Sequence, residues 1–139
     1  MSAKLRHFAI VVKDQERSAK FYEQAFGFKR AGFAQGALGS AQFMSDGIVC
    51  LALLHYKKGH PAAGSIGEDF VGVHHFGIQV DDLDKASEAV EAAGGKFFFD
   101  LGDKNKKTGN YERKMVDPDG IIFDISHTGW AGTEDQVKA

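Results

Sequence analysis

Two histidines, His7 and His75, stand at matching places in a sequence that nearly repeats itself. Residues 7–14 read HFAIVVKD and residues 75–82 read HFGIQVDD, and the same offset continues into the element that follows each. A repeat of this length, present only twice, indicates two copies of one small α/β unit rather than a solenoid. Imidazole is a common metal ligand. If the two copies pack about a pseudo-twofold axis, both histidines reach the same point.

Asp124 is a third residue whose chemistry does not match its surroundings. It lies within 121–126, an apolar segment typical of a strand, where aspartate is disfavoured. A buried carboxylate is costly unless it is paired or binds a metal. His7, His75 and Asp124 therefore predict a site with two imidazoles, one carboxylate and open positions. Such a set suits Fe(II), Mn(II), Ni(II) or Zn(II), and its typical occurrence in non-haem Fe(II) oxygenases favours Fe(II).

Four further residues, Tyr111, Glu112, Lys114 and His127, are candidates for acid–base catalysis near a substrate. The alternative for Glu112 and Lys114 is that they belong, with Arg113, to a solvated strand edge. His127 lies at the end of the last predicted strand, where its ring would donate a hydrogen bond to a bound oxyanion.

Other side chains bear on the space around the histidines. Ala9 and Gly77 each follow a histidine by two residues on the same strand face, and their small size predicts room for a substrate. His74 has the opposite parity and is predicted to face a helix, either supporting a ligand or lying on the surface. Cys50 is predicted in the core, and only a one-residue bulge would make it a ligand. Trp130 either closes the pocket or anchors the end of the chain.

Hydrophobic periodicity gives each copy one helix and four strands. The predicted strands are 5–12, 28–33, 41–44 and 48–56 in the first copy and 73–80, 96–99, 111–116 and 121–126 in the second. The predicted helices, 15–26 and 83–93, each follow an aspartate suited to cap them, Asp14 and Asp82. The chain is thus predicted to be α+β and one domain, 1–139, with β-α-β-β-β modules at 4–56 and 73–130, a linker at 57–72 and a polar tail at 131–139.

Composition narrows the classes of protein and partner. The chain has 139 residues and a net charge of −2, which gives no general attraction to nucleic acid or to an anionic membrane. A single cysteine excludes an intrachain disulfide framework and suits a reducing cytoplasm. No apolar run approaches the ~20 residues that cross a bilayer. We therefore expect a cytoplasmic protein with no nucleic-acid or membrane partner.

The chain resembles the vicinal oxygen chelate superfamily, which includes glyoxalases, bleomycin- and fosfomycin-resistance proteins and extradiol ring-cleaving dioxygenases. The resemblance extends from about Leu5 to Trp130. It rests on the paired modules, the first-strand histidines, Phe21-Tyr22 followed by Gly27-Phe28, and Asp117-Pro118-Asp119-Gly120 before the last strand. It implies a curved mixed sheet around a metal-centred cavity, with His7, His75 and Asp124 as the metal ligands.

Two departures from the family pattern bear on the reaction. The family's carboxylate ligand is usually glutamate, and Asp124 is one methylene shorter. Glyoxalases usually have a fourth ligand on the last strand of the first module. Counting back by the offset between the turns Asp46-Gly47 and Asp119-Gly120 places Leu51 there, so the usual carboxylate base for isomerisation is missing.

The sequence therefore predicts a divalent-metal-dependent enzyme, extradiol-dioxygenase-like, that chelates a small molecule through vicinal oxygens. The alternatives are a glyoxalase-like lyase or isomerase and a non-enzymatic resistance protein that sequesters a drug or metabolite. A homodimer is predicted because the family commonly completes its cavity across a twofold interface, and such contacts are the commonest oligomer symmetry.

Overall fold

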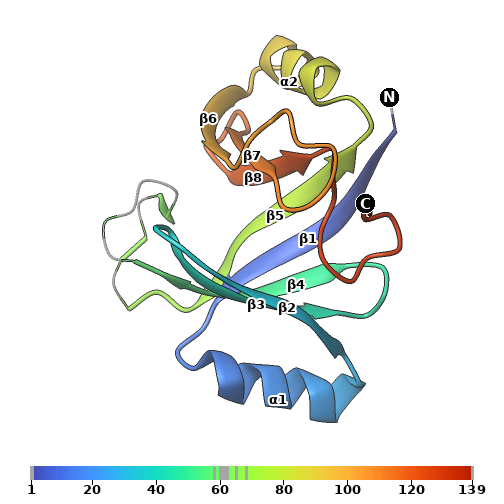
Figure 1. The fold of residues 1–139 in the computed structure, drawn as a ribbon. Helices are drawn as coiled ribbons and strands as arrows, with labels where there is room; N and C mark the ends of the chain where they lie inside the picture. The colour runs from blue at the N-terminus through green and yellow to red at the C-terminus, as the bar shows by residue number, and fades with distance from the viewer. Residues whose placement is uncertain (1, 58, 60–62, 65, 68, 139) are drawn as a thin grey trace.

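The computed structural model describes residues 2–57, 59, 63, 64, 66, 67 and 69–138. Its elements form two sets with the same order (Figure 1). The first set is β1 (Ala3–Val11), α1 (Gln15–Phe26), β2 (Lys29–Gln35), β3 (Gly39–Ser45) and β4 (Cys50–Tyr56). The second set is β5 (Gly72–Val80), α2 (Leu83–Ala92), β6 (Lys96–Leu101), β7 (Glu112–Val116) and β8 (Ile122–Ser126). The predicted α+β class with two β-α-β-β-β modules is confirmed.

The eight strands make one sheet, in the order β2-β3-β4-β1-β5-β8-β7-β6. The first strands of the two modules, β1 and β5, pair antiparallel at its centre. Each first strand also pairs in parallel with the last strand of its own module, β1 with β4 and β5 with β8. This arrangement is the pseudo-twofold packing that brings matching residues of the two modules together.

The two helices cover opposite ends of the sheet (Figure 1). Asp14 and Asp82 accept hydrogen bonds from the backbone N–H groups of Arg17 and Lys85, so both predicted caps are confirmed. Gly27 ends α1 in the left-handed conformation, with φ of 71°. Neither described helix has the length and apolar character needed to span a membrane.

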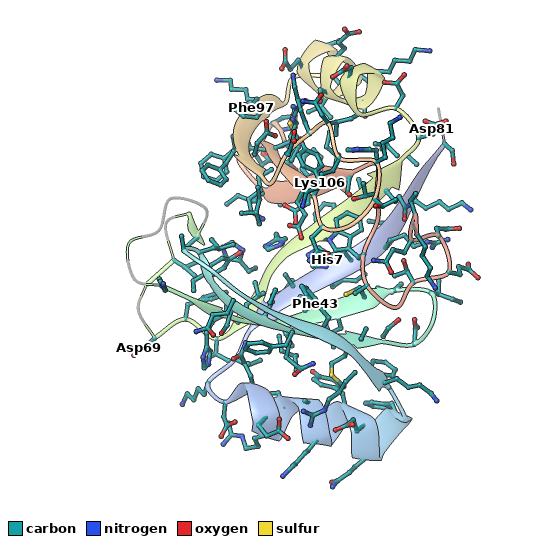
Figure 2. The ribbon with its side chains drawn as sticks, in the orientation of Figure 1. His7, Phe43, Asp69, Asp81, Phe97 and Lys106 are labelled. Carbon is teal, nitrogen blue, oxygen red and sulfur yellow. The ribbon has the colours of Figure 1, made fainter. Side chains whose placement is uncertain are left out.

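Strand alternation gives the sheet a helix face and a cavity face. On the helix face, α1 packs over a cluster that includes Leu51 and Leu53, and α2 packs over one that includes Met115 and Phe123. The cavity face of the first module carries Ala9, Ala52, Leu54 and their neighbours, among them Phe43. The central strand β1 therefore presents His7 between the two packed halves (Figure 2).

Two β-bulges interrupt the pairing of β1 with β5. The partner of Leu5 is Ile78 and the partner of His7 is Gly77, which leaves Arg6 as an extra residue. In β5 the partner of Val73 is Ile10 and that of His75 is Ala9, which leaves His74 as the extra residue. A bulge re-aims the side chain at the extra position. Each of the paired histidines thus follows a bulged residue.

The chain end after β8 folds against the rest of the molecule, unlike the polar tail predicted at 131–139. The Arg6 guanidinium lies 2.6 Å from the Asp135 carboxylate, and the Gln79 amide donates to the Asp135 carbonyl. Thr133 is 3% exposed. The predicted linker at 57–72 lies partly outside the described residues, and its last residue belongs to β5.

Candidate metal centre

Four side chains converge where the two modules meet. His7, His75, Glu112 and Asp124 each offer one ligand atom, and these atoms all lie within 4.8 Å of one another. The Nε2 atoms of His7 and His75 are 3.3 Å apart, and Asp124 Oδ2 lies 3.6 Å from the first and 3.0 Å from the second. The structure therefore brings together the three residues that the sequence nominated as ligands and adds Glu112.

These residues fit a divalent metal ion. Two atoms bound to one ion at about 2.0–2.2 Å lie roughly 3 Å or slightly more from each other, as the nitrogen and carboxylate atoms do here. Asp124 Oδ2 is fully buried and has no hydrogen-bond partner among the described residues. An unpaired carboxylate oxygen in such a place is costly, and a bound cation removes that cost. His7, His75 and Asp124 would hold the ion, with Glu112 within reach of it.

His74 orients the ring of His75. Its Nε2 lies 2.6 Å from the carbonyl oxygen of Ala63, which can only accept, so Nε2 carries the hydrogen. Burial lowers the pKa of both imidazoles, so both rings are neutral near pH 7. His74 Nδ1 is then an acceptor, and His75 Nδ1–H donates to it at 2.7 Å. His75 Nε2 is left with a free lone pair that faces Asp124, which is the form a metal requires.

The bulge explains why the predicted direction of the His74 side chain, toward a helix, is wrong. Strict alternation would turn this side chain to the helix face, but the bulged residue leaves the alternation and its ring lies against His75. Of the two roles left open for His74, the geometry favours support of a ligand.

Lys114 is the second buried ion beside Asp124. Its side chain is 1% exposed, and its Nζ lies 2.9 Å from Asp124 Oδ1 and 3.6 Å from Glu112 Oε2. Burial opposes the charged form, but the two carboxylates outweigh it and raise the pKa of Lys114. The lysine therefore stays protonated and holds one oxygen of Asp124, while the other oxygen faces the histidines.

Glu112, one of the predicted acid–base candidates, belongs to the ligand cluster, which the sequence argument did not predict. Its Oε1 accepts a hydrogen bond of 3.1 Å from the indole Nε1–H of Trp130. Burial, followed by the negative charge of Asp124, raises the pKa of Glu112. The solvated-edge alternative is wrong because β7 lies inside the sheet, between β8 and β6. Alternation would have given the signal, since Glu112 must share a face with Lys114.

Burial dominates the electrostatics of the two central histidines. It lowers the pKa of His7 from 6.5 to about 3 and that of His75 well below 6.5. Neutral imidazoles with free lone pairs are therefore the stable form near pH 7, as metal binding requires.

Trp130 occupies the space that the sequence argument reserved for substrate beside Gly77. A Cβ at Gly77 would lie 2.6 Å from the Trp130 ring and 3.0 Å from His7 Cβ. The indole stacks on the His7 ring with centroids 4.9 Å apart and an angle of 5° between the planes. The small residue at position 77 therefore admits an indole that holds both His7 and Glu112.

Two of the four predicted acid–base residues do not reach the cluster. Tyr111 belongs to the core under α2 and donates to Asp100 at 2.9 Å. His127 lies within hydrogen-bond distance of the Lys106 carbonyl, at 2.6 Å, and packs against Tyr111. Both positions have the parity of the helix face, opposite to Asp124, so alternation turns them away. Glu112 and Lys114 both line the cavity.

The strand register of the first module shows that the counterpart of Asp124 is Ala52 and not the predicted Leu51. Asp124 pairs with Gly77, and the matching pair in the first module is Ala52 with Ala9. Leu51, obtained by counting from the turns, packs instead under α1. The segment after the Asp46 turn holds one more residue than its equivalent, which shifts the count by one. The conclusion that this strand offers no carboxylate stands. Cys50 is buried, as predicted, and burial raises its pKa to about 12.

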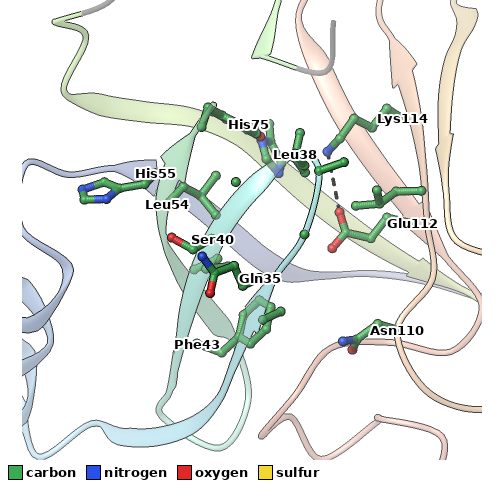
Figure 3. Close-up of a pocket in the computed structure, with 18 of the residues that line it drawn as sticks. Gln35, Leu38, Ser40, Phe43, Leu54, His55, His75, Asn110, Glu112 and Lys114 are labelled. Atoms are coloured by element: carbon green, nitrogen blue, oxygen red, sulfur yellow. Dashed lines mark hydrogen bonds and ion pairs between the residues drawn. The ribbon is translucent and has the colours of Figure 1, made fainter. Parts of the chain in front are cut away.

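A cavity of about 330 Å³ opens beside the cluster. Figure 3 shows His75, Glu112 and Lys114 at one end and Phe43 and Asn110 toward the other. The walls are largely apolar and come from both modules: Leu38, Phe43, Leu54, Tyr56, Phe99 and Leu101. A polar, anionic and imidazole-bearing end joined to an apolar chamber is typical of a small-molecule site.

Paired modules around a buried histidine–carboxylate cluster define the class of the vicinal oxygen chelate fold. The model of the Glyoxalase/Bleomycin resistance protein/Dioxygenase superfamily matches residues 4–125, and the chain belongs to that superfamily.

Individual relatives agree with this membership. A putative lactoylglutathione lyase of Brassica oleracea var. gemmifera is 30% identical over 131 residues, which cover 88% of this chain and 44% of the relative. A hypothetical protein of Bacillus halodurans C-125 has a similar structure, with a TM-score of 0.73, 20% identity and coverage of 90% and 94% of the two chains. A Streptomyces coelicolor methylmalonyl-CoA epimerase variant in complex with 2-nitronate-propionyl-CoA gives a TM-score of 0.72, 16% identity and coverage of 88% and 94%.

The curated relatives and the solved structures are similar to this chain in different ways. The chain spans 44% and 36% of the two curated lactoylglutathione lyase relatives that it matches. The solved structures share the fold at low identity.

Proposed function

We propose that the protein is a metal-dependent lyase or isomerase that moves a proton on a small substrate held through two neighbouring oxygens. His7, His75 and Asp124 would hold the metal. The position of Glu112 is the observation that supports this proposal best. Its carboxylate lies within 4.8 Å of the ligand atoms of His7, His75 and Asp124. The sequence favoured dioxygenation because Leu51 stood where the usual carboxylate base is expected. Glu112 provides a carboxylate near the proposed metal from a different strand, β7.

Trp130 and Lys114 hold the Glu112 carboxylate in place, and Glu112 would transfer the proton. The indole N–H of Trp130 fixes Glu112 Oε1, and Lys114 lies near the other oxygen. A carboxylate whose pKa is raised by burial is a better proton acceptor near neutral pH. Glu112 would take a proton from the carbon beside a substrate carbonyl and return it to the neighbouring carbon or to the other face.

A bound divalent metal would supply Lewis acidity that stabilises the negative charge developing on the substrate oxygens. Lys114 donates a hydrogen bond of 2.9 Å to Asp124 Oδ1 and so holds this carboxylate in place. The apolar walls exclude water from the carbon that loses its proton. Membership of a superfamily whose relatives include lactoylglutathione lyases and whose fold neighbours include methylmalonyl-CoA epimerases supports this class of reaction.

Exchange of a substrate C–H proton with deuterated water tests the proposal. Protein reconstituted separately with Fe(II), Mn(II), Ni(II) or Zn(II) is assayed with a hemithioacetal, a methylmalonyl thioester and simple α-hydroxyketones. Glu112→Gln should abolish exchange yet keep bound metal, since three ligands remain. Glu88→Gln, a change of the same type at an exposed position of α2, should alter neither. Full exchange activity in Glu112→Gln would exclude this role.

Extradiol-type dioxygenation is the second candidate. The three ligands His7, His75 and Asp124 form the facial set typical of non-haem Fe(II) oxygenases, and the aromatic lining suits a catechol. Oxygen uptake and ring cleavage by the Fe(II) protein with catechols, unaffected by Glu112→Gln, would favour it. Tight binding of a small molecule with no turnover under any metal would favour the third alternative, a resistance-type binder.

A further inference from the structure

The cavity offers little to an anionic substrate body. Among the described residues that line it, Lys114 is the one ammonium and no guanidinium occurs. Lys114 is already engaged by two carboxylates and is 1% exposed. The other polar side chains in the lining, apart from the cluster itself, are Gln35, Ser40, His55, Tyr56 and Asn110, none of which is a permanent cation. A carboxylate or phosphate on the substrate would therefore enter an apolar space that gives it no free cationic partner among the described residues, which is costly.

The lysine-bearing loop between β6 and β7 supplies no such partner at its described contacts. The carbonyl of Lys106 bonds His127, which has the parity of the helix face. Lys104 lines a separate hollow together with Asp81, Asp82 and Asp84 at the start of α2. The loop contributes Asn110 to the cavity lining.

The opposite walls favour an uncharged, apolar body. Phe43, Ala52 and Leu54 project from the first module, and Phe99 and Leu101 come from the second. The volume of about 330 Å³ lies at the small end of the roughly 300–1,000 Å³ found for ligand pockets. A compact apolar group fills such a chamber, whereas a tripeptide or nucleotide carrier would extend outside it.

We propose that the substrate is a compact, uncharged molecule with vicinal oxygens at one end and an apolar body that lies between Phe43, Leu54 and Leu101. Its body carries neither the carboxylates of a glutathione conjugate nor the phosphates of a coenzyme A thioester. This inference rests on the proposed function, because the vicinal oxygens need the metal cluster. It separates this chain from the activities named for its relatives and fold neighbours.

Two probes with the same chelating head and different bodies provide the test. Binding of 4-propylcatechol and of 3-(3,4-dihydroxyphenyl)propanoate to the Zn(II)-loaded protein is measured by calorimetry. The uncharged probe should bind about tenfold more tightly or better, because the carboxylate of the other loses water without gaining a cation. Glutathione and coenzyme A should not displace it. Equal or tighter binding of the carboxylate probe, or displacement by either carrier, would overturn the inference.

Two lysine variants test whether the preference for the uncharged probe arises in the cavity. Gln35 lines the cavity and is exposed, so Gln35→Lys adds a cation there without burying it. This variant should narrow the ratio of the two affinities several-fold by improving the carboxylate probe. Ser2→Lys adds the same charge at an exposed residue outside the lining and should leave the ratio unchanged. An equal response of both variants would mean that the preference does not arise in the cavity.

The outcomes separate this inference from the proposed function. A protein that binds no Zn(II), or that binds Zn(II) but neither catechol, lacks the chelating site and overturns both. A protein that binds the catechol head but prefers the anionic body keeps the chelating site and loses only the inference about the substrate.

Discussion

Asp124 has two partners of different kinds, and substitution should separate them. Its Oδ1 pairs with Lys114 at 2.9 Å, and its Oδ2 faces the histidines. Asp124→Asn should lose metal and should also lower stability by about 3–5 kcal/mol, because a buried ammonium is left without its main partner. Thermal melts and elemental analysis measure the two effects.

A second substitution identifies which effect belongs to the metal. Asp124→Asn combined with Lys114→Met removes the stranded charge, so most of the stability should return while metal binding stays lost. Asp124→Glu restores the family's usual ligand and should keep metal, with some strain in the packed site. Full metal occupancy in Asp124→Asn would exclude the aspartate as a ligand.

His74 provides a prediction about a residue that acts through another. His74→Phe keeps a ring but removes the acceptor for His75 Nδ1–H, so the tautomer of His75 is no longer fixed. Affinity for Zn(II) should fall about 10- to 100-fold, as for other residues that orient ligands. Nitrogen chemical shifts of His75 in the metal-free protein should show a mixture of tautomers.

The matched control is His55→Phe, which changes an exposed histidine that also lines the cavity but bonds the Lys13 carbonyl. This variant should keep the parent affinity and a single His75 tautomer. An unchanged tautomer in His74→Phe would refute the positioning role.

At the scale of elements, the contact between Gly77 of β5 and Trp130 sets the shape of the site. Gly77→Ala places a methyl group where the indole lies and should destabilise the fold by about 1–3 kcal/mol. It should also weaken metal binding, because the indole stacks on His7 and bonds Glu112. Gly36→Ala, where nothing lies within 4 Å of the added carbon, is the control for both measurements. Equal effects of the two variants would deny the indole a role in the site.

The order of the helices and strands, and the sheet face on which most side chains lie, could be predicted from the sequence because both follow from periodicity and repetition. The match of His7 with His75 gave the module boundary, and alternation placed Asp124 on the face of the cavity. The same alternation puts Glu112 and Lys114 on one strand face, and both were acid–base candidates. Their place in the cluster could not be decided from the sequence, because a run of charged residues is also typical of a solvated edge and only the strand order shows that β7 is interior.

Bulges and register lay beyond the reach of pattern arguments. The bulge at His74 depends on pairing between β1 and β5, strands separated by most of the first module. The position of Leu51 failed by one residue for a related reason. Strand β4 begins four residues after Asp46, whereas β8 begins three residues after Asp119, so a count from the two turns misses by one. A shift of one residue moves a side chain to the other face of a sheet.

At the scale of the whole molecule, the buried histidines should make stability depend on pH. Unfolded histidines titrate near 6.5, whereas burial holds the pKa of His7 at about 3. Between these values the unfolded state binds a proton that the folded state does not, so stability falls as pH decreases from 6.5 toward 3. Urea unfolding of chelator-treated protein across this range should show a slope that His7→Gln reduces by up to about 1.4 kcal/mol per pH unit. An unchanged slope would mean that His7 titrates alike in both states.

Assembly and metal content provide the last prediction. The protein is expected to be a homodimer, since isologous pairs are the commonest oligomers. All four residues of the cluster nevertheless come from one chain, each from a strand of the same sheet. Each chain should therefore bind about one divalent ion whether or not it is paired. Sedimentation over a dilution series, with metal content measured at each step, checks both statements. A monomer at every concentration would contradict the dimer. Loss of metal on dissociation would mean that the partner chain completes the site, which the convergence of His7, His75, Glu112 and Asp124 within one chain argues against.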